Sequence, residues 1–203
     1  MKSYVVIQKP AVPPQQLILL FHGVGSNARD MVPVGQQFAT HCPEAMVVSV
    51  EGFQDCDFGH GRQWFSVAGI TEDNRPGRIA AVMPSFQALI PQLQQSSDVP
   101  SESTTLIGFS QGSIMALEST QTLPVLSSKV IAFSGRFASA PTVAPLGVSF
   151  HLIHGDADAV VSVENSRQAA EQLQALGAKI SLDIEPGMGH GINARMMAMA
   201  LGQ

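Results

Sequence analysis

The sequence predicts an α/β fold: a mostly parallel central sheet of about seven strands with helices on both of its faces. Two observations predict this architecture. Short apolar runs rich in β-branched residues recur along the chain, and helical patterns lie between most of them, which is the alternation typical of parallel sheets. With 203 residues and 45% hydrophobic content, the chain is long enough to bury a large core. We therefore expect a single domain over residues 1–203.

Seven segments are predicted to be strands because each is short, apolar and bounded by polar or turn-forming residues. In chain order they are Tyr4 to Ile7, Leu17 to Phe21, Met46 to Val50, Thr104 to Phe109, Lys129 to Phe133, Ser149 to Ile153 and Lys179 to Ile184. Pro10, Pro13 and Pro14 leave only a short linker between the first two. Because a parallel connection needs a longer crossover, the first strand should lie antiparallel at the edge of the sheet.

The helical patterns lie between these strands. They cover about Met31 to His41, Ile79 to Gln95, Gln111 to Leu123, Glu164 to Leu176 and His190 to Leu201. Two other segments are predicted to be loops. Ala138 to Pro145 is rich in Ala and Pro and should lie on the surface. The segment from Glu51 to Gly77 is long and carries aromatic residues between glycines, and long loops in small domains are often functional.

Charge and composition argue against several classes of protein. The formal net charge is −5, and the four lysines and seven arginines form no basic run, so we expect no nucleic-acid partner. No apolar run approaches the roughly 20 residues of a transmembrane helix, and the run at Tyr4 to Ile7 is too short for a signal peptide. Cys42 and Cys56 lack disulfide-framework and metal-site spacing. We therefore expect a cytoplasmic protein with reduced thiols and no stable membrane anchoring.

Ser110 lies in the pattern Gly108-x-Ser110-x-Gly112, directly after a predicted strand and directly before a predicted helix. This context is typical of a nucleophile elbow, in which a sharp turn points the serine oxygen out of the sheet. The flanking glycines are needed because side chains there would collide with the neighbouring strand or helix. A serine is a weak nucleophile at neutral pH, so the chemistry also needs a histidine base and a group that orients it.

His190 is the preferred base among the six histidines. It follows the last predicted strand in the glycine-rich stretch PGMGHGI, where a loop can present an imidazole at the carboxyl edge of the sheet. The other five are assigned different places: His22 and His154 in buried turns at strand ends, His60 along the site, and His41 and His151 in structural positions.

Asp156 and Asp158 are the candidates for the orienting acid. Both lie on the loop after the sixth predicted strand, and aspartates beside glycine are also common turn formers. Residue physics leaves the choice between them open. The chain order of serine, aspartate and histidine is nevertheless the order of the α/β-hydrolase triad, which differs from the orders in other common serine hydrolases.

Five motifs together resemble those of the carboxylesterase/phospholipase family of α/β-hydrolases, which includes acyl-protein thioesterases, lysophospholipases and small bacterial carboxylesterases. The motifs are LFHGVGSN, GRQWFSV, GFSQGS, HGDADAVV and GHGI, and they extend from Phe21 to Ile192. The RQWFSV and ITEDNRP segments most resemble the small bacterial carboxylesterases. The resemblance implies an α/β-hydrolase fold, and the short chain leaves no room for a large lid domain.

The resemblance also implies roles for particular residues. Ser110 matches the family nucleophile, His190 the base in the GHGI motif, and Asp158 the acid, as the second aspartate of HGDAD. The backbone N–H groups of Val24 and Gln111 match the donors of the oxyanion hole. The sequence departs from the family at Ala159, where many relatives have proline, and this departure weakens the rigidity expected of the loop that carries the acid.

These assignments predict a serine hydrolase of broad specificity for short to medium acyl esters or thioesters, acting through an acyl-enzyme. A lysophospholipase or an acyl-protein thioesterase is the alternative within the family. The chemistry needs no metal and no organic cofactor. Candidate pocket residues lie on loops at the same sheet edge: Phe53, Phe58, Trp64, Phe65, Ile70, Phe137 and Met188. Only 13% of the residues are charged, and the neutral surface leaves a homodimer open.

A dinucleotide-binding protein is the alternative outside this class. Gly23-x-Gly25-x-x-Ala28 fits the pattern of a pyrophosphate-binding turn, and Glu51 ends the next strand, where an acid would bind the ribose. In such a turn the helix opens within the glycine motif, which would put Pro33 inside it at a cost of about 3 kcal/mol. If Asp30 instead caps a helix that begins near Met31, Pro33 falls in the tolerated first turn. The later helix start favours the hydrolase.

Overall fold

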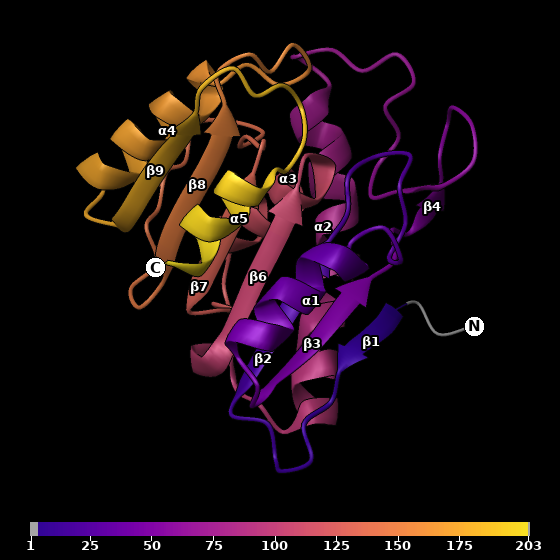
Figure 1. Ribbon diagram of the computed structural model, residues 1–203. Helices are drawn as coiled ribbons and strands as arrows, with labels where there is room; N and C mark the ends of the chain where they lie inside the picture. Colours follow the sequence, from indigo (N-terminus) through magenta and orange to yellow (C-terminus); the bar gives the residue numbers. More distant parts are fainter. Residues whose placement is uncertain (1–3, 203) are drawn as a thin grey trace.

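A seven-stranded sheet forms the centre of the computed structural model, which describes residues 4–202 (Figure 1). The strands are β1 (Tyr4–Gln8), β2 (Gln16–Phe21), β3 (Ala45–Val50), β6 (Thr104–Phe109), β7 (Lys129–Phe133), β8 (Ser149–Gly155) and β9 (Lys179–Glu185). Their order is β1-β3-β2-β6-β7-β8-β9, and all neighbours are parallel except β1, which pairs antiparallel with β3 at the edge. The predicted fold class is confirmed.

Helices cover both faces of the sheet (Figure 1). The helices are α1 (Val32–His41), α2 (Arg75–Ser97), α3 (Gln111–Glu118), α4 (Glu164–Ala175) and α5 (Ala194–Leu201). The buried side chains of α1 and α5 pack on one face, and those of α2, α3 and α4 pack on the other. Among residues 4–202, no helix is long and apolar enough to cross a membrane.

The sequence of β2 shows how this layering arises. Its residues from Leu17 to Phe21 are all buried, although side chains on a strand alternate between the two faces. Leu17 and Leu19 belong to the core under α2, α3 and α4, whereas Ile18 and Leu20 belong to the core under α1 and α5. A continuous apolar run is therefore the pattern expected of a strand covered on both faces.

The strand order reverses direction between β2 and β6. From β2 the chain adds β3 on one side and then crosses to β6 on the other side. Such a reversal leaves a crevice at the carboxyl ends of the two strands, because the connections that follow them run in opposite directions. The loop after β2 begins at His22 and the turn after β6 contains Ser110, so both lie at this crevice.

The long segment 51–77 contains a small hairpin that the sequence did not predict. In it, β4 (Gln54–Asp55) pairs antiparallel with β5 (Arg62–Gln63). The Arg62 amide donates to the Ser26 carbonyl over 2.7 Å, and the Arg62 carbonyl accepts from the Gly25 amide over 2.9 Å. The hairpin is therefore attached to the loop after β2. Two-residue strands carry no hydrophobic periodicity, which is why sequence patterns miss them.

Asp30 does not cap α1, and that prediction is wrong. The cap position is Met31, which makes no side-chain cap hydrogen bond. The Oδ2 of Asp30 instead accepts from the Ser26 hydroxyl (2.8 Å) and from the Asn27 side-chain amide (2.9 Å). The carboxylate is thus used within the preceding loop, while Pro33 lies in the first turn of the helix as predicted.

Three other helix boundaries differ from the predictions. α2 begins at Arg75 instead of near Ile79, and α3 ends at Glu118, where the 3-10 helix Ser119–Gln121 follows. α5 begins at Ala194 instead of at His190, because the side chain of Asn193 accepts a hydrogen bond from the Met196 amide and caps the helix there. His190 consequently lies on the loop between β9 and α5 and is not part of the helix.

Candidate active site

Ser110 occupies a strained turn between β6 and α3. Its φ of 52° and ψ of −115° lie in a region that residues other than glycine rarely adopt. The Ser110 amide donates to the Phe133 carbonyl over 3.0 Å, and the Ser110 carbonyl accepts from the Ile114 amide over 3.1 Å. Contacts on both sides therefore hold the serine in the unusual conformation that the elbow pattern predicts.

The two glycines of the pattern are required by close backbone approach. A Cβ atom at Gly108 would lie 2.3 Å from the Ser113 nitrogen, and one at Gly112 would lie 2.1 Å from the Phe21 carbonyl oxygen. No real Cβ makes contacts this short, and backbone atoms cannot turn aside as a flexible side chain can. The strand, the elbow and α3 can therefore pack together only with glycine at both positions.

Ser110, His190 and Asp158 form a chain of hydrogen bonds across the carboxyl edge of the sheet. The Nε2 of His190 lies 2.9 Å from the Ser110 Oγ, and its Nδ1 lies 2.7 Å from the Asp158 Oδ2. The other carboxylate oxygen, Oδ1, accepts from the amides of Val160 (2.8 Å) and Val161 (2.9 Å). Asp156 lies elsewhere, with its Oδ1 accepting from the Gly187 amide. The geometry thus distinguishes Asp158 from Asp156, a choice that the chemistry of the residues alone left open.

The surroundings of Asp158 keep it ionised. Burial of its side chain favours the neutral acid, but hydrogen bonds from His190 and from the Val161 and Val160 amides outweigh burial and lower its pKa below the ordinary value. A negative charge is therefore present next to the imidazole, where it can stabilise a protonated ring.

His154 lies behind the aspartate and is fully buried. Its Nε2 donates to the Val161 carbonyl over 2.8 Å and lies 3.3 Å from the Asp158 Oδ2, while its Nδ1 accepts from the Ser166 hydroxyl over 2.7 Å. Burial lowers its pKa, which suits a neutral ring with one donor and one acceptor. The predicted structural position at a strand end therefore also places this ring against the acid.

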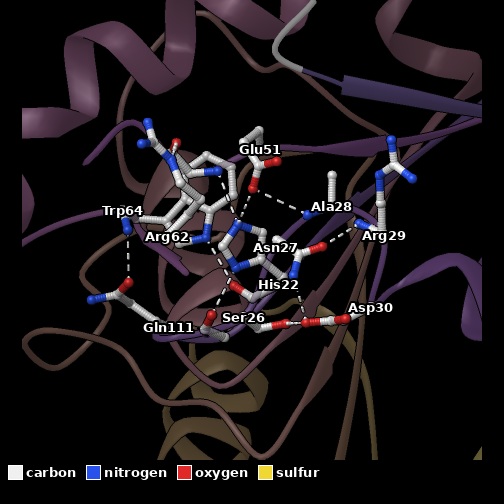
Figure 2. Close-up of polar contacts among 12 residues, drawn as sticks. His22, Ser26, Asn27, Ala28, Arg29, Asp30, Glu51, Arg62, Trp64 and Gln111 are labelled. Carbon is white, nitrogen blue, oxygen red and sulfur yellow. Dashed lines mark hydrogen bonds and ion pairs between the residues drawn. The ribbon is translucent and has the colours of Figure 1, made fainter. Parts of the chain in front are cut away.

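His22 connects the loop after β2 with the loop after β3. Its Nδ1 donates to the Gly23 carbonyl over 2.7 Å, and its Nε2 accepts from the Gly52 amide over 2.9 Å. Burial lowers the pKa of His22, in keeping with a neutral ring. Figure 2 shows Glu51 reaching toward this ring and toward the Ala28 amide, which donates to its Oε1 over 3.1 Å. The start of the loop is thus fixed from two sides.

Trp64 joins this loop to Gln111, the first residue of α3 (Figure 2). Its indole Nε1 donates to the His22 carbonyl over 2.9 Å, and its backbone amide donates to the Gln111 side-chain oxygen over 2.7 Å. The Gln111 side-chain nitrogen in turn donates to the Phe65 carbonyl over 2.7 Å. These buried bonds position the backbone of residue 111, the first residue of α3, relative to the loop after β2.

A cavity of about 440 Å³ opens beside Ser110. Its walls come from the loop after β2, the segment before α2, the start of α3, and the loops after β7 and β8. They are formed by Val24, Phe65, Val67, Ile70, Glu72, Arg75, Ser110, Gln111, Ile114, Arg136, Val160, Val161, Ser162 and Asn165. The size is within the range of small-ligand sites.

Only Phe65 and Ile70 of the seven predicted pocket residues line this cavity, and the expected pocket is revised accordingly. Trp64 is completely buried, with its ring among Phe21, Phe53 and Phe86. Large aromatic side chains on a loop can serve the core as readily as a pocket. The remaining four lie apart from the cavity walls. Phe53 packs edge-on against the Trp64 ring, Phe58 is exposed, Phe137 is buried beside another hollow, and Met188 packs in the core under α5.

Several cavity residues escaped sequence reasoning, notably Glu72, Arg75 and Arg136. Glu72 and Arg136 are far apart in the chain yet form an ion pair of 2.9 Å. One signal could have pointed to Arg136, because it closely follows the carboxyl end of β7, the sheet edge at which sites of open α/β sheets gather. His60 is not among the residues that line the cavity.

The loop after β2 does not have the geometry of a dinucleotide turn. α1 begins at Val32, after the glycine motif has ended. The Glu51 carboxylate, which a ribose would need, accepts a hydrogen bond from the Ala28 amide of the same loop. The helix therefore begins too late for a dinucleotide turn, and the Glu51 carboxylate is already occupied by a hydrogen bond within the protein.

The fold and the site define the class of protein as an α/β-hydrolase. The family model described as phospholipase/carboxylesterase matches residues 2–202, and the chain therefore belongs to that family. This result confirms the resemblance that the sequence motifs predict.

Three relatives illustrate the similarity. Esterase YpfH of Escherichia coli (strain K12) is 48% identical over 199 residues, which cover 98% of this chain and 86% of that protein. The crystal structure of esterase PE8 has a TM-score of 0.84 with 31% identity, covering 96% of this chain and 94% of that chain. The carboxylesterase of Bacillus cereus shares the fold with a TM-score of 0.83 at 20% identity, covering 98% and 91%. The protein is a hydrolase of the phospholipase/carboxylesterase family.

Proposed function

We propose that the protein is a serine esterase of broad specificity in which Ser110 attacks short to medium acyl esters or thioesters. The observation that carries the proposal is the 2.9 Å contact between the Ser110 Oγ and the His190 Nε2. A hydroxyl within hydrogen-bond reach of an imidazole nitrogen can transfer its proton as it attacks.

Asp158 sets the tautomer of His190 in this mechanism. Because the His190 Nδ1–H donates a hydrogen bond to the carboxylate and keeps its proton, the Nε2 is left free to accept the proton of Ser110. The Oγ then forms a bond to the carbonyl carbon, and the bond from that carbon to the leaving oxygen or sulfur breaks. The protonated ring passes its proton to the leaving alcohol or thiol as it departs. Water attacks the acyl-enzyme with His190 again as the base, and Ser110 recovers its proton.

The backbone amides of Val24 and Gln111 stabilise the oxyanion in this proposal. Both residues line the cavity with Ser110, and a Cβ atom at Gly23 would come within 3.2 Å of the Ser110 Cβ, so the two loops approach closely. The Gln111 amide belongs to the first turn of α3, where N–H groups have no partner within the helix. Each donor of this kind contributes roughly 10²- to 10³-fold to the rate.

His22 orients the backbone N–H of Val24 through the peptide group that joins Gly23 to Val24. That peptide is trans, so its carbonyl and its N–H point in opposite directions. The His22 Nδ1 holds the Gly23 carbonyl on the buried side. The Val24 N–H is thereby directed away from the ring, which is the orientation an oxyanion at the crevice requires.

The size and the lining of the cavity favour a small substrate. Its volume of about 440 Å³ suits short to medium acyl chains, and its apolar walls favour burial of such chains. Lysophospholipids and acylated proteins present longer chains, and they are the alternative substrates within the family.

A chain-length series tests the proposal. Acyl 4-nitrophenyl esters and matching thioesters, from acetyl to palmitoyl, are compared on the wild type and on Ser110→Ala. We expect the highest kcat/KM at short or medium length and loss of nearly all cleavage in the variant. Undiminished cleavage by Ser110→Ala would show that the nucleophile is misassigned, and a clear preference for palmitoyl esters would favour the long-chain alternatives.

A further inference from the structure

Three charged side chains stand out on the walls of the catalytic cavity. Among its lining residues in the described part of the chain, only Glu72, Arg75 and Arg136 carry full charges. Glu72 comes from the segment that leads into α2, Arg75 is the first residue of α2, and Arg136 comes from the loop after β7. Two cations and one anion therefore share a cavity whose other walls are neutral.

The Glu72 carboxylate contacts both arginines. Its two oxygens accept from Nη1 (3.2 Å) and Nη2 (2.9 Å) of Arg136. The buried Nη1 of Arg75 lies against the Glu72 Oε1 as an ion pair but without the alignment of a hydrogen bond. Arg136 donates once more, from Nε to the Phe137 carbonyl. Since a guanidinium has five N–H donors, both arginines retain donors for a ligand.

The cluster carries a net positive charge at neutral pH. The contacts with Arg75 and Arg136 lower the pKa of Glu72 below its usual value, so the carboxyl is ionised and cancels only one of the two cations. The side chains of Arg75 and Arg136 are 17% and 21% exposed, whereas that of Glu72 is 68% exposed. Bulk water therefore screens the anion more than the two cations.

We propose that this cavity selects esters that carry a carboxylate or phosphate, which Arg136 and Arg75 bind while Ser110 acts on the ester carbonyl. The inference rests on the proposed function of Ser110 and names its substrate class. Planar guanidinium groups suit these anions because their paired donors match two oxygens at once. A local positive charge in a chain of formal net charge −5 also distinguishes the cavity from the rest of the molecule and draws anions to it.

A purely structural role explains the cluster less well. One arginine bound in a bidentate manner to Glu72 is sufficient to tie the loop after β7 to the start of α2. The second arginine adds a charge that no lining carboxylate of the described chain balances. Placing an unbalanced, largely buried cation costs free energy, and binding of an anionic ligand offsets that cost.

Paired substrates test the inference. The acyl pair is 4-nitrophenyl hexanoate and the mono-4-nitrophenyl ester of adipic acid, which have equal chain length and differ by a terminal carboxylate. The alcohol pair is 1-butyrylglycerol and 1-butyrylglycerol 3-phosphate. The ratio of kcat/KM for the anionic member over the neutral member is measured on the wild type, Arg136→Gln, Arg75→Gln and Glu72→Gln. Arg167→Gln, an arginine of α4 paired with Glu164, is the control.

We expect the wild-type ratio for at least one pair to be one or higher and to fall at high salt. It should fall at least about fivefold in either cavity arginine variant, rise in Glu72→Gln, and stay unchanged in the control. Because the neutral ester reports the folded, active fraction in each variant, partial unfolding does not alter the ratio. The pair that responds identifies which side of the ester bears the charge.

A ratio that stays unchanged in either Arg136→Gln or Arg75→Gln for both substrate pairs would overturn the inference. So would wild-type ratios far below one for both pairs. Either result would leave the serine esterase intact. Loss of cleavage of every substrate by the folded wild type would instead overturn the proposed function, and the inference with it.

Discussion

His22 offers the sharpest test of how the oxyanion loop is held, because its two ring nitrogens serve different loops. Asparagine at this position can still donate to the Gly23 carbonyl from its side-chain nitrogen, close to where Nδ1 lies, but it cannot reach the Gly52 amide. Glutamine can accept from the Gly52 amide but cannot donate from the Nδ1 position. His22→Asn and His22→Gln therefore separate the two hydrogen bonds of 2.7 and 2.9 Å.

His22→Asn leaves the buried Gly52 amide without its partner, which costs about 1–3 kcal/mol. In His22→Gln the Gly23 carbonyl keeps the longer hydrogen bond of 3.3 Å from the Ser26 amide. For a chain of this size, the melting temperature should fall by roughly 2–4 °C for each kcal/mol, so His22→Gln should be at least as stable as His22→Asn. The order of the kcat values should be the reverse, because only His22→Gln loses the shorter bond that fixes the peptide carrying the Val24 N–H, and loss of such a donor costs up to about 10²- to 10³-fold.

Thermal melts followed by circular dichroism and kcat at saturating 4-nitrophenyl butyrate provide the two measurements. We expect His22→Gln to be at least about tenfold slower than His22→Asn, although it should be at least as stable. Equal kcat losses, or a slower His22→Asn, would refute the argument that His22 acts through the Gly23 carbonyl.

Three further predictions follow from the same structure. Asp158→Asn should lower kcat in an esterase assay by about 10⁴-fold, because the imidazole loses the tautomer that the carboxylate fixes. The kcat of Asp156→Asn should stay within a few-fold of the wild-type value, and equal effects of the two substitutions would contradict the assignment. In urea titrations, Gly112→Ala should lower the free energy of unfolding by about 1–3 kcal/mol or more, because the new Cβ would overlap the backbone of β2. A Cβ at Gly77 meets no atoms within 4 Å, so Gly77→Ala should be neutral or stabilising. Because burial lowers the pKa of His22 in the folded chain, the unfolded chain takes up its proton first. Stability should therefore decline as the pH falls from about 6.5 toward the lowered pKa, and His22→Gln should show a smaller decline in urea titrations between pH 7 and pH 5.

The strands were the most predictable part of the fold. The ranges Thr104–Phe109 and Lys129–Phe133 agree with the prediction at both ends, because strands covered on both faces are short apolar runs with polar boundaries. Helix starts were less predictable. Asp30 has the chemistry of a cap, yet its carboxylate binds groups in its own loop, and sequence pattern does not reveal which of two local hydrogen bonds is the more stable.

The candidate site could be predicted only in part. Ser110 and His190 stand out by motif and position, whereas Asp158 was chosen over Asp156 by family resemblance alone. Trp64 was assigned to the pocket because it is aromatic and lies on a loop, but it fills the core between β2 and α2. The cavity cations were missed because Arg136 and Glu72 meet only through the tertiary fold, and local sequence carries no signal of such a contact.

Labelling with a fluorophosphonate tests directly whether Ser110 is the nucleophile. The reagent is added to the folded protein, residual hydrolysis of 4-nitrophenyl butyrate is followed, and the labelled peptide is identified by mass spectrometry. We expect one adduct per chain, on the Ser110 oxygen, with esterase activity lost in proportion to labelling and no adduct in Ser110→Ala or in urea-unfolded protein. Full activity without labelling, or an adduct on another residue that accounts for the loss of activity, would contradict it.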